Sequence, residues 1–258
     1  SRAPAAGNHR VSIPDQGYRG LMLDFTIARL RNRWIKNRLQ KFELPPLAET
    51  NLQALDHLSL KQRVKNLRFV VLDLETTGLS LTRDHVVSLA AYRVVEGRIL
   101  LGDTFNSLVN PDRTIPSSAV RIHGIVPSMV ARAPLLEEVF DQFLCYLGTD
   151  ILVGYHVKFD LNFLNICMQQ RFGFPLQNLV IDAMLLCRKI LYPGHLRSYA
   201  LRFKGDQDLD AVAKHFGIQI HERHTAEGDA LATAMIFQRI LAKLEKTGPG
   251  QLRDLLST

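Results

Sequence analysis

The sequence predicts an α/β domain in which helices cover the faces of a mixed β-sheet. Three observations lead to this fold class. Runs of β-branched and apolar residues typical of strands dominate residues 67–110, and apolar spacing typical of helices dominates from residue 134 onward. Between two of the helical segments lies a short strand pattern, ILVGY (151–155). Strands come first in the chain, helices come later, and one strand lies between two of the helices. This order is typical of a mixed sheet.

The first expected element is a basic amphipathic helix in residues 21–42. Its Lys and Arg residues are interspersed with apolar residues at close to helical spacing, namely Leu23, Ile27, Leu30, Trp34 and Leu39. The whole net charge of +7 lies in residues 1–66, which hold 12 Lys and Arg against 5 Asp and Glu, whereas residues 67–258 hold 20 of each. The helix could be a solvated element docked on the main domain, or it could contact phosphates, a membrane surface or a protein partner.

Prolines mark a boundary after this helix. Pro45 and Pro46 in ELPPLAET (43–50) break the helical pattern, and a buried strand pattern begins shortly after residue 66. The expected organisation is a basic helical N-terminal extension, a main α/β domain and a C-terminal tail, over residues 1–66, 67–244 and 245–258.

The main domain begins with its strands. RFVVLDLETTG (68–78) is typical of a buried strand that ends in turn-forming polar residues. Residues 85–110 contain two strand patterns joined by a turn at Glu96 and Gly97, which predicts a β-hairpin. Five helical patterns follow, over residues 135–147, 157–172, 182–191, 209–217 and 225–246. A basic, turn-rich connection over residues 193–208 lies between the third and the fourth.

Acidic residues lie near the ends of the predicted strands and the starts of the predicted helices. Asp73 and Glu75 are two residues apart on the first strand, so their side chains project from the same face. Asp160 lies on the first turn of the helix after ILVGY, and Asp229 lies near the start of the last helix, shortly after His224. Each carboxylate has an ordinary explanation by itself, because acidic residues favour solvated strand ends and helix N-termini.

One chemistry accounts for all five residues together. Hard divalent cations such as Mg²⁺ and Mn²⁺ take oxygen ligands, and a pair of them can activate a water and stabilise the leaving oxygen of a phosphodiester. Four carboxylates would supply the ligands, and His224 could accept the proton of the water near neutral pH. A zinc hydrolase would require more histidine or thiolate ligands than this set contains.

Three ordered motifs carry a resemblance to a known family. VLDLETTGL (71–79), GYHVKFDLNFL (154–164) and HTAEGDALAT (224–233) resemble the motifs of the DEDDh, or DnaQ-like, 3′–5′ exonucleases, a group that includes proofreading epsilon subunits. The resemblance covers about residues 67–244. It implies a ribonuclease H-like fold, with a mixed five-stranded sheet flanked by helices. It also implies two divalent metal ions, Mg²⁺ or Mn²⁺, with His224 as the general base and four metal ligands, Asp73, Glu75, Asp160 and Asp229.

The same resemblance implies a pocket for the terminal nucleotide. The turn after the first motif would hold that nucleotide and wedge an apolar side chain against its base; its residues are Thr76, Thr77, Gly78 and Leu79. His123, in RIHGI (121–125), could line the pocket or bond locally within its loop. Phe163 could stack on a base, but core packing is the favoured interpretation. Asp182 is interpreted as a helix cap.

The expected substrate is a nucleic acid with a 3′ end, and likeness to proofreading subunits favours DNA. The expected products are nucleoside 5′-monophosphates. The alternatives are an exonuclease of the same family acting on RNA or short oligoribonucleotides, and a non-catalytic nucleic-acid-binding scaffold. The N-terminal extension could dock on a polymerase or another protein partner. No apolar run approaches the roughly 20 residues of a membrane span, and no secretory signal begins the sequence, so a cytoplasmic location is expected.

Overall fold

The computed structural model of the protein describes residues 21–191, 208–248 and 250–256. The basic connection predicted over 193–208 lies outside the described residues, except for Asp208. None of the helices in the described ranges is long and apolar enough to cross a membrane.

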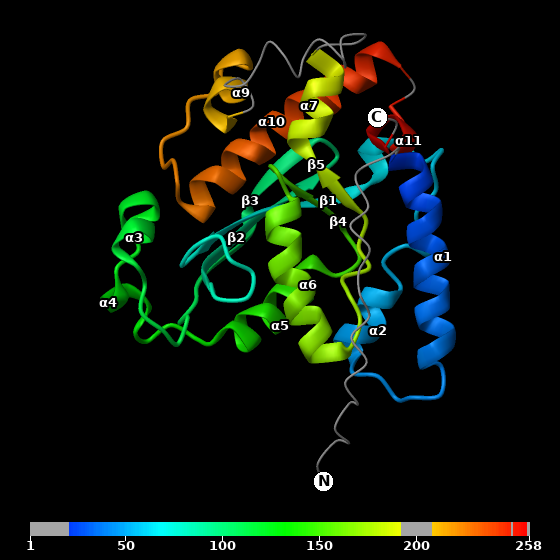
Figure 1. Cartoon of the computed structure of the whole chain (residues 1–258). Coiled ribbons are helices and arrows are strands. Elements are labelled where there is room, and N and C mark those ends of the chain that lie inside the picture. Colours follow the sequence, from blue (N-terminus) through cyan, green and yellow to red (C-terminus); the bar gives the residue numbers. More distant parts are fainter. Residues whose placement is uncertain (1–20, 192–207, 249, 257–258) are drawn as a thin grey trace.

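A five-stranded mixed sheet forms the centre of the molecule, as the resemblance to DnaQ-like exonucleases implies (Figure 1). Its order is β3-β2-β1-β4-β5, with β1, β2 and β3 antiparallel and β1, β4 and β5 parallel. The strands are β1 (Arg68–Thr76), β2 (Val86–Val95), β3 (Arg98–Leu108), β4 (Ile151–Gly154) and β5 (Val180–Asp182). The predicted hairpin turn joins β2 to β3, and both Glu96 and Gly97 adopt the positive φ that such two-residue turns favour.

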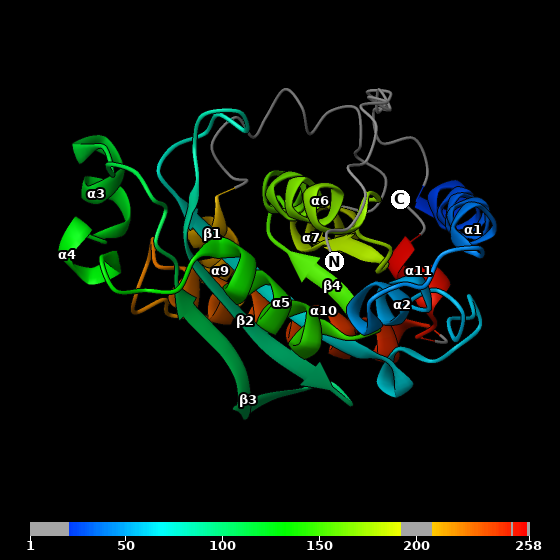
Figure 2. The same cartoon turned by 90° about the horizontal axis from the view of Figure 1, so that it is seen from below.

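Helices surround this sheet on both faces (Figures 1 and 2). They are α1 (Leu21–Leu39), α2 (Pro46–Leu52), α3 (Ser117–His123), α4 (Pro127–Val130), α5 (Leu136–Leu147), α6 (Lys158–Phe172), α7 (Ala183–Leu191), α9 (Leu209–His215), α10 (Ala226–Thr247) and α11 (Leu252–Leu256). A short 3₁₀ turn (Val64–Asn66) precedes β1. The five helices expected in the main domain are present, with boundaries within about two residues of those predicted.

The central strand β1 explains how the two faces are built. Its side chains alternate, so Phe69 and Val71 join the core cluster beneath α10, whereas Val70 and Leu72 join the cluster beneath α5 and α6. The ring of Phe69 packs edge-on against Phe237 of α10, with ring centres 4.9 Å apart. Asp73 and Glu75 continue the Phe69 series and therefore project toward the α10 side of the sheet.

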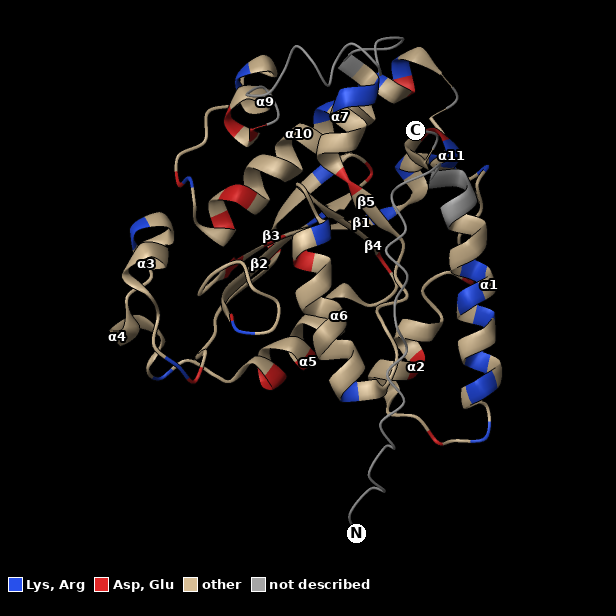
Figure 3. Ribbon diagram, viewed as in Figure 1, with Lys and Arg blue, Asp and Glu red and all other residues tan. Residues whose placement is uncertain are grey.

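The described part of the N-terminal extension packs against the main domain. Phe25 of α1 joins the cluster under α10, and Ile35 of α1 joins the cluster under α5 and α6. The amide of Asn32 donates a hydrogen bond to the carbonyl of Leu52 at 3.0 Å, which ties α1 to α2. At the other end of the chain, α11 buries Leu252 in the cluster under α10. These contacts support the interpretation of the basic helix as an element docked on the domain. Figure 3 marks the basic positions along α1, and Arg29, Arg31, Arg33 and Arg38 are exposed.

Candidate metal centre

Three carboxylates meet where β1 ends beside the start of α10. Asp73 and Glu75 come from β1, and Asp229 comes from the first turn of α10. One oxygen from each lies within 4.8 Å of an oxygen from each of the others. We call these three residues the acidic cluster. All of its donor atoms are carboxylate oxygens, which are the ligands that hard divalent cations prefer.

Asp160 lies beside this cluster, in the first turn of α6 as predicted. Its side chain is buried, and its Oδ1 accepts a hydrogen bond from the backbone amide of Leu74 at 3.2 Å. That bond ties the start of α6 to the end of β1. The negative charge of Asp160 also raises the pKa of Asp73, so the two groups share one electrostatic environment.

Asp182 caps α7, as the sequence indicates. Its Oδ1 accepts hydrogen bonds from the backbone amides of Met184 and Leu185, at 3.0 and 3.3 Å. Burial raises the pKa of Asp182, and its charge in turn raises the pKa of Asp160. Asp182 therefore both caps α7 and influences the electrostatics of the site.

The pKa values of these carboxyl groups show how strongly burial and mutual repulsion disfavour their ionised forms. Burial raises the pKa of Asp73 well above its usual range, and the charges of Asp160 and Asp229 raise it further. Burial and the charge of Asp229 raise the pKa of Glu75 to about 8, and burial raises that of Asp160 to about 7. A nearby cation would favour the ionised form of all of these groups at neutral pH. The oxygen donor set and this surplus of negative charge both fit a divalent metal ion.

Arg223 supplies positive charge at the edge of the acidic cluster. Its Nη1 contacts Asp229 Oδ2, its Nε donates to Asp210 Oδ2 at 3.0 Å, and its Nη2 donates to Asp208 Oδ1 at 3.0 Å. Sequence reasoning missed this residue. Its position next to His224 was the available signal, but its contacts depend on α9, which only the fold brings close.

His224 lies in the turn just before α10. Its backbone amide is 3.4 Å from Asp229 Oδ1, and its exposed ring places Nδ1 at 3.3 Å from Nη1 of Arg223. Because a guanidinium can only donate, Nδ1 accepts in this contact, and a neutral ring then carries its proton on Nε2. His224 has a φ of 62°, so the turn holds it in the left-handed region.

The same turn is fixed by the cap of α10. Thr225 Oγ1 accepts a hydrogen bond from the amide of Gly228 at 3.0 Å and donates one to the carbonyl of Glu222 at 2.8 Å. A Cβ added to Gly228 would lie 1.9 Å from the carbonyl oxygen of Glu222. Sequence reasoning missed this glycine, although it lies within the third motif. Its missing side chain lets the turn that carries His224 pack closely on α10.

The turn predicted to hold the terminal nucleotide follows β1 directly. Thr76 Oγ1 donates to the carbonyl of Gly78 at 2.7 Å, and Thr77 Oγ1 donates to Asp84 Oδ1 at 2.9 Å. A Cβ on Gly78 would lie 2.7 Å from the Asp84 carboxylate, so a larger residue would force this hydrogen-bonded side chain to move. Leu79 projects from the turn with 83% of its surface exposed. The geometry leaves Leu79 free to touch a ligand.

His123 and Phe163 are both buried. Nδ1 of His123 accepts a hydrogen bond from the backbone amide of Ile125 at 3.0 Å, and Nε2 is buried without a hydrogen-bond partner among the described residues. Local bonding is therefore present. Burial lowers the pKa of His123, and the nearby backbone of Thr76 opposes that shift. Phe163 packs against Phe159 with ring centres 5.1 Å apart and belongs to the core cluster under α6. Its burial supports the favoured core interpretation over stacking on a base.

Comparison with known proteins identifies the family. Residues 70–237 match the family described as "Exonuclease". The chain belongs to this exonuclease family. The matched segment encloses the acidic cluster, Asp160 and His224. The predicted DnaQ-like identity and the prediction of a nuclease enzyme are thereby confirmed.

Several relatives of this exonuclease have names that refer to DNA polymerase III. It is 34% identical over 187 residues to DNA polymerase III subunit epsilon of Aquifex aeolicus, covering 72% of this chain and 87% of that protein. It is 40% identical over 185 residues to a DNA polymerase III subunit epsilon-like protein of Rhodobacter capsulatus, covering 70% of this chain but 25% of that protein. The PolC-type DNA polymerase III of Caldanaerobacter subterraneus is 36% identical over 189 residues, covering 73% of this chain and 13% of the polymerase. The exonuclease thus spans a quarter or less of the last two relatives.

Solved structures share the fold. Exonuclease I has a TM-score of 0.56 and 23% identity, covering 70% of this chain and 42% of that one. Cell-death related nuclease 4 has a TM-score of 0.54 and 20% identity, covering 68% of this chain and 64% of that one. These likenesses confirm the predicted ribonuclease H-like fold.

Proposed function

We propose that this exonuclease removes nucleotides from the 3′ end of DNA with the aid of two divalent cations, Mg²⁺ or Mn²⁺, and releases nucleoside 5′-monophosphates. The observation that carries the proposal is the meeting of Asp73, Glu75 and Asp229 within 4.8 Å, with raised pKa values, in a chain of an exonuclease family. The likeness to the DNA polymerase III subunit epsilon of Aquifex aeolicus supports DNA as substrate. The proposed 3′–5′ direction follows from the resemblance of the three motifs to those of DnaQ-like exonucleases.

The acidic cluster and Asp160 would hold the cations. Two bound cations would stabilise the charge that develops on the phosphodiester and favour deprotonation of the attacking water. The amide of Leu74 and the cap of α10 fix the direction of Asp160 and Asp229 before any ligand binds. Such prior positioning reduces the reorganisation that catalysis requires.

His224 would accept the proton of the attacking water. Its Nδ1 is engaged by Arg223, so the base role requires this contact to open or the exposed ring to turn. Leu79 would pack against the terminal base, and the turn of Thr76 and Thr77 would place the terminal nucleotide. In this arrangement His224 would transfer the proton, and the turn after β1 would position the nucleotide.

An association with a polymerase is proposed from the relatives. The Rhodobacter capsulatus and Caldanaerobacter subterraneus proteins are longer chains whose names refer to DNA polymerase III. The basic extension of residues 1–66 is the proposed docking arm, as the charge pattern of the sequence indicates. Loss of co-purification with a polymerase subunit after removal of residues 1–20 would place the docking contact in that part of the extension.

Substitution of two residues tests the proposed chemistry. Asp160→Asn should lose nearly all cleavage of DNA in Mg²⁺ or Mn²⁺, whereas His224→Ala should lose rate but keep Mn²⁺ binding as measured by electron paramagnetic resonance. Asp141→Asn on α5 is the matched control, because its carboxylate contacts Arg171 on the surface. Full activity of the Asp160 variant would contradict the proposal. Matched DNA and RNA strands in the same assay decide between a deoxyribonuclease and a ribonuclease.

A further inference from the structure

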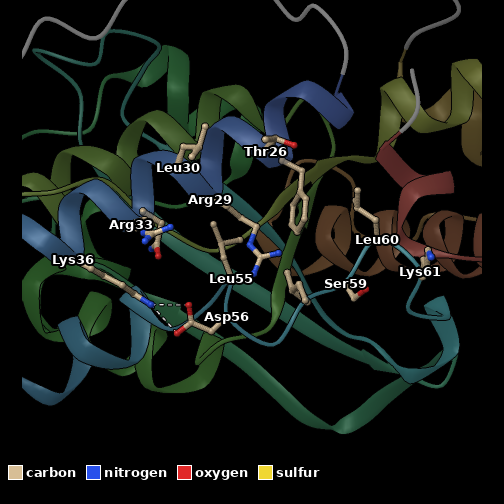
Figure 4. A pocket seen from close by; sticks show the side chains of 13 residues that line it. Thr26, Arg29, Leu30, Arg33, Lys36, Leu55, Asp56, Ser59, Leu60 and Lys61 are labelled. Atoms are coloured by element: carbon tan, nitrogen blue, oxygen red, sulfur yellow. Dashed lines mark hydrogen bonds and ion pairs between the residues drawn. The ribbon is translucent and has the colours of Figure 1, made fainter.

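A groove runs along α1 on the side that faces residues 55–61 (Figure 4). Its volume is about 820 Å³. One wall is α1, with Arg29 and Arg33, and the other carries Ser59 and Lys61. Figure 4 shows Arg29 reaching from α1 into the space in front of Leu55. Figures 1 and 2 show α1 at the opposite side of the molecule from α3 and α4.

The walls of this groove carry uncompensated positive charge. Asp56 is the acidic residue of the lining, and both of its carboxylate oxygens accept hydrogen bonds from Lys36 at 2.7 Å. None of Arg29, Arg33 and Lys61 forms an ion pair with any residue that the structure describes. Arg29 and Arg33 are four residues apart, so they are neighbours on one face of the helix. Both walls therefore attract an anion.

The floor of the groove is apolar but closed. Phe25, Leu55 and Leu58 form it, and each is at most 3% exposed. Leu30 of α1 also lines the groove and is 62% exposed, so a partner would meet an exposed apolar side chain there but no open apolar pocket at the floor. Thr26 and Ser59 add hydroxyl groups at the rim, which can donate to phosphate oxygens.

An exposed aromatic residue lies on the outer surface of the same helix. Trp34 is 59% exposed, and the guanidinium of Arg38 lies 5.5 Å from the centre of its ring. Exposed aromatic rings beside a basic groove are the usual components of single-strand binding, in which bases stack while cations follow the backbone. The preceding residues 1–20 carry three Arg and one Asp, so their net charge has the same sign as the groove and gives them no electrostatic attraction to it.

We propose that this groove binds the phosphate backbone of single-stranded DNA upstream of the 3′ end that enters the metal centre. The inference rests on the proposed function, because the 3′ end of the same strand must occupy the acidic cluster. Short substrates would be held by the metal centre alone. Longer strands would gain a second binding region through Arg29, Arg33 and Lys61.

The test compares a short and a long oligonucleotide, of roughly 4 and roughly 24 nucleotides, the short one fitting within a single binding site. In Arg29→Glu/Arg33→Glu protein, KM for the long strand should rise by about tenfold, because two attractive phosphate interactions become repulsive. The kcat values and the KM of the short strand should stay within about twofold of the wild type. Binding of the long strand is measured in EDTA by fluorescence anisotropy at several salt concentrations. The slope of log K against log salt concentration should become less negative by about 0.7 for each phosphate that the variant no longer neutralises.

The matched control is Arg98→Glu/Arg239→Glu, which makes the same change of charge at exposed positions on β3 and α10. It should leave both KM values near those of the wild type. An unchanged KM for the long strand in the groove variant, or an equal rise for both strands, would overturn the proposal. Binding of an acidic peptide but not of DNA at Arg29 and Arg33 would also overturn it and assign the groove to a protein. If wild-type protein cleaves neither strand, the proposed function itself is wrong.

Discussion

The guanidinium of Arg223 contacts the carboxylate of Asp229, one of the three groups of the acidic cluster. Asp208 and Asp210 hold the other nitrogens of the same guanidinium, which fixes it between α9 and α10. The positive charge opposes the rise in the pKa of Asp73 and Glu75. In the metal-free protein, Arg223 therefore offsets part of the repulsion among the carboxylates of the acidic cluster. A bound metal ion would reduce the same repulsion.

Replacing Arg223 by glutamine should destabilise the metal-free protein and strengthen metal binding. The loss of charge-assisted hydrogen bonds at the partly buried Asp229 should lower the free energy of unfolding by about 1–3 kcal/mol. Mn²⁺ should bind more tightly, because no cation competes for that carboxylate. Denaturant unfolding and electron paramagnetic resonance measure the two effects. Arg171→Gln, which removes a surface ion pair with Asp141, is the control and should change neither by much.

The stability of the metal-free protein should fall as pH rises. Glu75 keeps its proton in the folded protein up to about pH 8, whereas its ordinary pKa is 4.5. Between these values the folded state binds more protons than the unfolded state, so the free energy of unfolding decreases with increasing pH. Asp160, with a pKa of about 7, acts in the same direction.

Metal ions should reverse that trend. A divalent cation binds the ionised carboxylates, so it must displace these protons, and its affinity rises with pH. The increase in Tm on adding Mg²⁺ should be larger at about pH 8.5 than at about pH 6. An equal increase at both pH values would show that the acidic cluster does not bind the ion.

Gly228→Ala should impair catalysis through the position of His224. The added Cβ would overlap the carbonyl of Glu222, so the turn must move, at a cost of about 1–3 kcal/mol. A shift of the turn by about 1 Å should lower kcat by about a hundredfold. Gly102→Ala is the control, since a Cβ there meets no atom within 4 Å. Wild-type turnover in the Gly228 variant would show that this close packing does not position the base.

Leu79 and Phe163 should separate substrate contact from core packing. Leu79→Ser removes an exposed side chain, so stability should change by about 0.5 kcal/mol at most, while KM for DNA rises about tenfold. Phe163→Ala should instead cost about 3–5 kcal/mol of stability, because it empties a buried position. Thermal melting and steady-state kinetics on both variants measure these quantities. A stable Phe163 variant with a raised KM would favour base stacking at that position.

Local patterns in the sequence were sufficient for most of the fold. Alternation in β1, the turn at Glu96 and Gly97, and long apolar periodicities predict their elements because each signal lies within one segment. The strand β5 and the short helices α3, α4 and α11 were missed, because each has seven residues or fewer and too little periodicity. The burial of α11 depends on its contacts with α1 near the other end of the chain, which no local pattern records.

In the candidate site, too, local patterns predict some features, and others depend on contacts between distant parts of the chain. Spacing alone places Asp73 and Glu75 on one face and Asp160 on a first helical turn, and the structure agrees. The network of Arg223 was not predictable, because Asp208 and Asp210 come from a different helix region and meet it only in the folded chain. Gly78 was expected as part of the turn that holds the nucleotide, and its close packing against the Asp84 carboxylate became visible only in the structure.

The most direct test of the proposed exonuclease is a digestion time course on one DNA strand labelled at either end. With Mg²⁺ or Mn²⁺, the 5′-labelled strand should shorten in single-nucleotide steps, and the 3′-labelled strand should release its label at once as a mononucleotide. EDTA and the Asp160→Asn substitution should abolish both. Early release of the 5′ label as a mononucleotide, internal cleavage, or undiminished activity in EDTA would contradict a metal-dependent 3′–5′ exonuclease.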